Sequence, residues 1–209
     1  MKYIIKGVEP ECLVEYRGMA NEDWQPSYDD LGGSRKDIIK EALMVEQGYI
    51  CCYCERELEL KDSHIEHFIP QSHSSCDPLD YNNMLCSCMK ERKKGDVLHC
   101  GAKKDNWYDE VLLVSPFDPS CEGKFVYTDD GRIKPSENGG VAAKETIEKL
   151  GLDCQKLVDE RKKILEVLIA KELTNEEMHE LFNQYLMREG GKFKSFWTMV
   201  DSKRVEYFG

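Results

Sequence analysis

Cysteine, histidine and carboxylate side chains are concentrated in one stretch that makes up about a quarter of the chain. Cys51 and Cys54 are separated by two residues, a spacing that lets two thiolates bind one zinc ion at about 2.3 Å while backbone amides face the sulfurs. A tetrahedral structural site needs two more ligands. We expect Cys88 and Cys100 to supply them, with Cys86 as the competing candidate. The simpler alternative is a set of core thiols that bind no metal.

His64, Glu66 and His67 form a second group of residues that could do chemistry. In a strand, His64 and Glu66 would share one face and His67 would point to the other, unless a distortion near Pro70 brings His67 into the same cleft. A carboxylate suits Mg²⁺ or Mn²⁺, and a neutral histidine can take a proton from water. A divalent ion with a histidine base is sufficient to cleave a phosphodiester. The alternative is that one or more of these histidines belongs to the zinc site or to the core.

Basic residues cluster in the same stretch, although the chain as a whole has a net charge of −11. The overall charge argues against a protein that coats nucleic acid by bulk attraction. We expect the basic cluster to face phosphate groups, and a solvated loop is the alternative. The cluster comprises Lys90, Arg92, Lys93, Lys94, Lys103 and Lys104.

Short strands and turns are predicted around these residues, after an irregular stretch over residues 1–34 that is rich in Pro and Gly. A helix begins at the capping residue Ser34 and ends near Gly48. The other predicted elements are a strand centred on 64–66 and ended by Pro70, the entry to a short strand or helix at 80–85, a strand at 111–114, and a hairpin that joins 124–128 to 132–134 through an Asp-Gly turn.

The chain is predicted to be helical from Val141 onward. Gly151 breaks the first helix, and a capping box from Thr174 to Glu177 begins another. We therefore divide the chain into residues 1–140, which carry the chemistry, and 141–209, a helical part that packs on the core or binds a partner. No apolar run is long enough to span a membrane, and the N-terminus lacks the pattern of a signal peptide. These features predict a cytoplasmic protein, where metal binding by the ten cysteines is favoured over disulfides.

The cysteine pairs and the run from Glu66 to Gln71 resemble the ββα-metal HNH endonucleases. More narrowly, several segments resemble the HNH nucleases called PtuB, which occur in Septu anti-phage systems and in some retrons. These segments are residues 47–50, 64–68, 79–83 and 99–101. The resemblance implies an α+β fold: a ββα-metal core with a zinc-binding cysteine cluster, a small β-hairpin region and a helical C-terminal part.

Matched residue by residue, the resemblance implies that His67 is the general base, that Glu66 binds the catalytic metal and that Asn83 orients the loop carrying the base. The four cysteines above match the structural zinc ligands. The chain departs from the family pattern in two places: eleven residues separate Cys88 from Cys100, and Gly101 stands where many HNH proteins carry the last metal-binding residue. His64 is the first candidate to replace that residue, followed by His99 and Asn106.

The resemblance also implies a partner, a PtuA-like ABC-type ATPase. The chain has no phosphate-binding loop motif of its own, so nucleotide control would come from that partner. The expected activity is endonucleolytic cleavage of DNA within a defence complex, with structural Zn²⁺ and catalytic Mg²⁺ or Mn²⁺. Two alternatives remain: the same chemistry on RNA or tRNA, and a zinc module that binds nucleic acid or a partner without cleaving.

Overall fold

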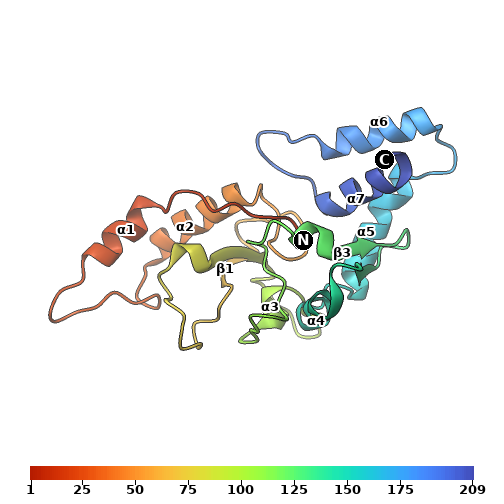
Figure 1. The fold of residues 1–209 in the computed structure, drawn as a ribbon. Coiled ribbons are helices and arrows are strands. Elements are labelled where there is room, and N and C mark those ends of the chain that lie inside the picture. Colours follow the sequence, from red (N-terminus) through yellow and green to blue (C-terminus); the bar gives the residue numbers. More distant parts are fainter.

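The computed structural model describes all 209 residues and shows an α+β fold with seven α-helices and two antiparallel β-hairpins. The molecule is elongated, with α1 at one end, α6 and α7 at the other, and β1 between them (Figure 1). No helix combines the length and the apolar composition needed to cross a lipid bilayer. The helices are α1 (Glu11–Gly18), α2 (Gly33–Glu46), α3 (Gly101–Lys104), α4 (Gly140–Leu150), α5 (Gln155–Leu168), α6 (Asn175–Leu186) and α7 (Trp197–Phe208).

The first hairpin pairs β1 (Ser63–His67) with β2 (Met84–Cys88). His64 lies opposite Ser87, and Glu66 lies opposite Leu85. All five residues of β2 are buried, because α2 packs along the hairpin with its apolar residues. The hairpin thus gives the chemistry-bearing segment a rigid, covered support.

The second hairpin pairs β3 (Phe125–Tyr127) with β4 (Ile133–Pro135), as the Asp-Gly turn predicts. Gly131 has a φ of +86°, and a Cβ at this position would lie 2.3 Å from the backbone oxygen of Val158. Only glycine fits this left-handed turn against α5.

The C-terminal helices begin and end close to the predicted positions. Gly151 ends α4 in a left-handed conformation, and the capping box between Thr174 and Glu177 is present at the start of α6. Helix α7 packs against α6 and β3. It also contacts the cysteine turn, because the backbone N–H of Thr198 donates to Glu55 Oε2 at 2.8 Å. The proposed division at residue 140 stays a prediction.

Three sequence predictions about secondary structure were wrong. Residues 111–114 form no strand, because the N–H groups of Val111 and Leu112 bond to the Asp109 side chain and that of Val114 bonds to Thr146. Helix α1 lies in the stretch predicted to be irregular, and it buries Leu13 and Tyr16. Helix α2 does not begin at a capping Ser34: its N-cap is Gly32, and no side chain caps it.

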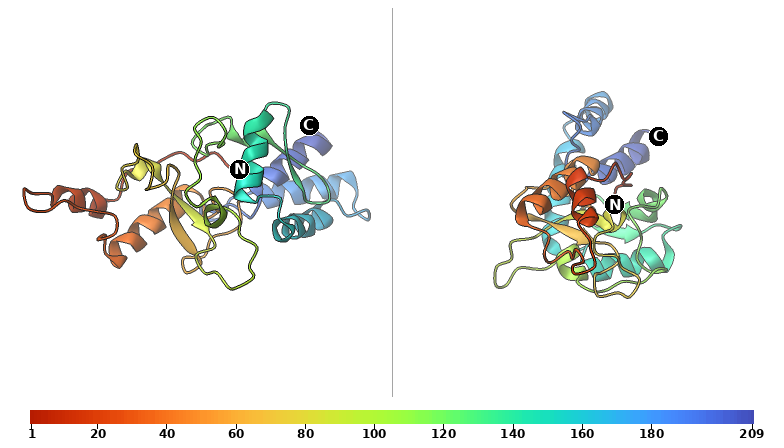
Figure 2. Two further views of the ribbon diagram at one scale, coloured as in Figure 1. Left: turned by 90° about the horizontal axis from the view of Figure 1, so that it is seen from below. Right: turned by 90° about the vertical axis from the view of Figure 1, so that its left-hand side faces the viewer.

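One hydrophobic core connects these elements. It includes the buried faces of α2, β2, α4, α5 and α7, and several cysteine side chains are part of it. The segment between β2 and α3 is different: residues 91–98 are all exposed, and the yellow-green loop projects from the body (Figure 2).

Candidate active site and metal centre

Four cysteines from three segments meet in the interior. The sulfurs of Cys51, Cys54, Cys88 and Cys100 all lie within 4.8 Å of one another, and all four residues are buried. The sulfur of Cys54 lies 3.8 Å from that of Cys88. Zn–S bonds of 2.3 Å in a tetrahedron require sulfurs about 3.8 Å apart, so the cluster could hold a metal ion such as zinc.

Local backbone structure explains how these cysteines meet. A turn brings Cys51 and Cys54 together, with the N–H of Glu55 donating to the backbone oxygen of Cys51 at 3.0 Å. Cys88 ends β2, and Cys100 precedes α3 with a φ of +56°. The N–H of Cys100 is held by the backbone oxygen of Leu150 at 2.7 Å, which ties this ligand segment to the end of α4.

Electrostatics inside the cluster favour one thiolate. Burial alone would raise the pKa of Cys51, but hydrogen bonds from the neighbouring thiols hold it well below its usual value. The pKa of Cys100 is raised well above its usual value, by burial and by the neighbouring cysteines. A cation in the centre would let all four cysteines be thiolates at once, because zinc binds cysteines in that form.

The other cysteines in this region stay outside the cluster. Cys86, the competing candidate, is buried two residues before Cys88 on the same strand, yet its sulfur is not among the four. Cys52 is also buried and also outside. His99 differs from both, because its Nδ1 lies 3.2 Å from the sulfur of Cys100.

Glu66 occupies a second buried polar site next to the cysteines. Its Oε1 accepts a hydrogen bond from the Tyr53 hydroxyl at 3.1 Å and forms an ion pair with Lys104 Nζ at 2.9 Å. Its Oε2 lies 3.6 Å from His64 Nε2. Burial would raise the pKa of Glu66, but His64 and Lys104 lower it, so the side chain is a carboxylate at neutral pH.

Gly101 faces this pair of side chains. A Cβ at residue 101 would lie 2.4 Å from Glu66 Oε2 and 2.9 Å from His64 Nε2. The side chains of His64 and Glu66 therefore fill the space into which a larger residue at 101 would project. Of the three candidates for the last catalytic ligand, His64 is beside Glu66, His99 faces the sulfurs, and Asn106 is exposed.

The His67 ring is buried, and neither of its nitrogens contacts Glu66. Nε2 lies 2.9 Å from the backbone oxygen of Pro78, and Nδ1 lies 3.3 Å from Gln71 Nε2. This pairing places the proton on Nε2 and the lone pair on Nδ1. The Tyr28 ring packs edge-on against it at 4.7 Å between centroids. Burial lowers the pKa of His67, so the ring is neutral at pH 7.

Asn83 holds the loop that follows His67. Its Oδ1 accepts from the N–H of Ile69 at 2.8 Å, and its Nδ2 donates to the oxygen of Ile69 at 2.9 Å. The backbone oxygen of Asn83 also accepts from the N–H of Phe68 at 2.9 Å. These bonds fix residues 68 and 69 relative to β2.

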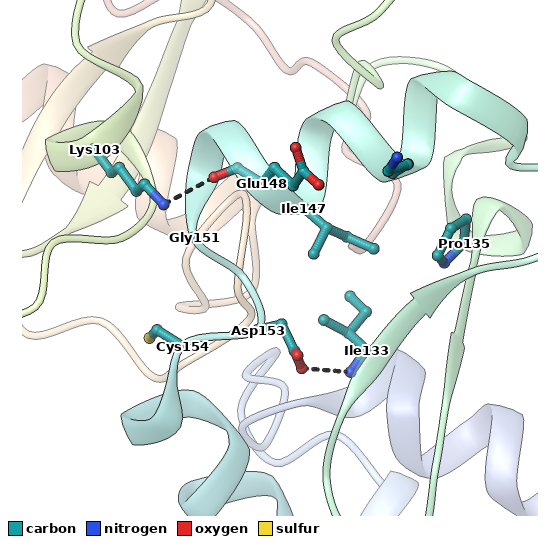
Figure 3. A pocket seen from close by; sticks show the side chains of 9 residues that line it. Lys103, Ile133, Pro135, Ile147, Glu148, Gly151, Asp153 and Cys154 are labelled. Carbon is teal, nitrogen blue, oxygen red and sulfur yellow. Dashed lines mark hydrogen bonds between the residues drawn. The ribbon is translucent and has the colours of Figure 1, made fainter.

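The predicted basic cluster is divided in the structure. Lys104 does not face solvent: its ammonium is buried between Glu66 and the backbone oxygen of His67. Lys103 is exposed on the other side of α3, where it donates to the backbone oxygen of Glu148 and lines a cavity of about 540 Å³ (Figure 3). That cavity contains none of the residues around Glu66. Four residues remain exposed before and in the projecting loop: Lys90, Arg92, Lys93 and Lys94.

The sequence did not reveal that Tyr53 and Tyr28 contact the site. It also did not reveal that Lys104 forms an ion pair there. Tyr53 lies inside the Cys-x-x-Cys turn, and a buried tyrosine hydroxyl usually needs a partner, which was an available signal. Nothing in the sequence places Tyr28 beside His67, because 39 positions separate them and the contact depends on the tertiary fold.

Comparison with known proteins gives two relatives along almost the whole chain. The chain is 32% identical over 194 residues to "Retron Vc95 putative HNH endonuclease" of Vibrio cholerae, covering 89% of this chain and 91% of the relative. It is 26% identical over 243 residues to "Retron Ec83 putative HNH endonuclease" of Escherichia coli, covering 96% and 93%. No family model matches the chain.

Proposed function

This chain belongs to the family of retron HNH endonucleases, and from this membership we propose that it is a metal-dependent endonuclease that cleaves DNA. One observation carries the proposal: a buried Glu66 carboxylate, with His64 beside it, precedes a neutral, buried His67 on a hairpin braced by four cysteines. This arrangement supports a ββα-metal core composed of β1, β2 and α3.

His67 acts as the general base in this proposal. The bond from Nε2 to the Pro78 oxygen fixes the tautomer and leaves the Nδ1 lone pair to accept a proton from water. Gln71 Nε2 lies 3.3 Å from Nδ1 and would move aside for the water. Asn83 keeps the backbone after His67 in place.

The residues fit two kinds of metal ion. The four cysteines would hold Zn²⁺ as a structural ion, since all four positions of a tetrahedron are filled by protein. Glu66 Oε2 and His64 Nε2 would hold Mg²⁺ or Mn²⁺, which would polarise the scissile phosphate and stabilise the leaving oxygen. Lys104 holds the other carboxylate oxygen and so orients Glu66.

The cellular setting is also a proposal. The resemblance to PtuB and the retron names of the two relatives support an effector of anti-phage defence. The same resemblance supports an ABC-type ATPase as the partner, which would supply the nucleotide control that this chain lacks.

Cleavage by the purified chain, alone and with its partner ATPase, tests the function. With Mn²⁺ or Mg²⁺, wild type should cut duplex DNA, and His67→Ala should not, while keeping its fold and metal content. His179→Ala, an exposed histidine on α6, is the matched control and should cut normally. If His67→Ala cut DNA as fast as wild type, His67 would not be the general base. Cutting of RNA alone would reassign the substrate, and binding without cutting would favour a non-catalytic module.

A further inference from the structure

A cavity of about 390 Å³ lies between the N-terminal end of α2 and the strand β1. Its size falls within the range of small-ligand sites, roughly 300–1,000 Å³. Its lining includes Gly33 and Lys36 of α2 and His64 of β1. Tyr28 and Lys90 also line it.

Two of the three lysines that line the cavity carry a positive charge that no carboxylate neutralises. Lys36 and Lys90 make no ion pair in the structure. The single acid in the lining is Asp37, which lies 3.7 Å from the Nζ of the buried Lys40. The first N–H groups of α2 add a partial positive charge near Gly33.

The cavity shares His64 with the candidate active site. His64 lines it with Nε2 at 3.6 Å from Glu66 Oε2, and its Nδ1 is buried without a hydrogen-bond partner. Tyr28 contacts the His67 ring on one side and lies under the Lys36 ammonium, which is 4.4 Å from the Tyr28 ring centroid. A ligand in the cavity would therefore contact His64 and the Tyr28 ring, which packs on His67.

We propose that this cavity binds a nucleotide phosphate of the substrate strand, next to the phosphate that is cleaved, with Lys36 and Lys90 as its cationic contacts. The inference rests on the proposed function, because the adjacent histidines make a polynucleotide the natural occupant. Lys90 leads into the projecting loop with Arg92, Lys93 and Lys94, so the strand has a basic path beyond the cavity. A free nucleotide would present the same phosphate chemistry, and the test separates these two sources.

The experiment measures binding of a labelled DNA duplex to the full chain carrying His67→Ala, as a function of salt concentration. Each phosphate that the protein neutralises contributes about 0.9 to the magnitude of the slope of log affinity against log salt. Because Lys36 and Lys90 would contact the same phosphate, the double alanine variant should lower that magnitude by about 0.9, and each single variant should lower it by part of that amount. Lys36→Arg should keep the slope, because it keeps the charge. Lys171→Ala, an exposed lysine far along the chain, is the matched control and should change nothing.

The results of this binding experiment separate the phosphate site from the nuclease assignment. DNA binding with an unchanged slope in both alanine variants would overturn the inference while leaving the nuclease assignment, which the cleavage assay tests separately. Direct binding of inorganic phosphate or a mononucleotide that is lost in both variants, without any DNA binding, would keep the phosphate site and replace its source. Absence of binding to DNA, mononucleotide and phosphate would overturn the inference. Lys90 is exposed, so its variant remains informative if Lys36→Ala does not fold.

Discussion

The Lys104 ammonium lies 2.9 Å from Glu66 Oε1 and 3.0 Å from the backbone oxygen of His67, fully enclosed by protein. One buried cation thus contacts both of the adjacent residues to which the chemistry is assigned. A buried ion pair is rarely a net source of stability, but removing one partner leaves the other charge buried alone. This contact sets the orientation of the carboxylate before any metal ion binds.

Replacing Lys104 with Met should destabilise the fold strongly, because Glu66 would remain buried without its counter-charge. We expect a loss of about 3–5 kcal/mol in the free energy of unfolding. Chemical denaturation measures it. The double variant with Glu66→Gln should lose less than the sum of the two single variants, and strict additivity would contradict the coupling.

Gly101→Ala should reduce cleavage without releasing the metal from the cysteines. The new Cβ would lie 2.4 Å from Glu66 Oε2, so the carboxylate and His64 must both shift. A displacement of about 1 Å at reacting groups can reduce the rate about 100-fold. Initial cleavage rates measure the effect. Gly123→Ala is the control, because a Cβ there meets nothing within 4 Å. Equal rates in the two variants would contradict the predicted crowding.

Asn83→Ala should loosen the loop after His67. It removes both side-chain hydrogen bonds to Ile69 and leaves two backbone groups without these partners. We expect a loss of about 1–3 kcal/mol in the free energy of unfolding and faster hydrogen exchange at the amides of residues 68 and 69. Hydrogen exchange measured by mass spectrometry shows which residues exchange faster and by how much. Protection unchanged from wild type would show that Asn83 does not hold this loop.

A comparison of Cys88→Ser with Cys86→Ser should show which of these two buried cysteines binds the metal. Both cysteines are buried on β2, but only the sulfur of Cys88 belongs to the four-sulfur cluster. Purified wild type and Cys86→Ser should each contain about one zinc per chain, and Cys88→Ser should contain much less. Elemental analysis gives the ratio. Loss of zinc from Cys86→Ser with retention in Cys88→Ser would reverse the ligand assignment.

The sequence was most informative where spacing is tied to local geometry. The Cys51–Cys54 turn, the Asp-Gly hairpin and the capping box at Thr174 depend on residues a few positions apart, and the structure shows all three. The ligand count of a tetrahedral ion predicted two further partners for the first pair, and Cys88 and Cys100, preferred over Cys86, lie beside it in the structure.

The sequence was least informative where distant segments determine the environment of a residue. Lys104 belongs to a basic run, and such runs are usually exposed, yet the one-turn helix α3 directs it inward to Glu66. Val111 to Val114 have the composition of a strand, but side-chain acceptors on Asp109 and Thr146 bind their N–H groups instead. Both outcomes depend on tertiary contacts that composition does not encode.

The segment between Cys88 and Cys100 has a consequence for which changes the fold tolerates. Its two ends are anchored at the sulfur cluster, while residues 91–98 are exposed. Doubling the length of such a loop costs only about 0.6 kcal/mol in closure entropy. A change in the length or charge of residues 91–98 should therefore cost little stability and leave the hairpin in place.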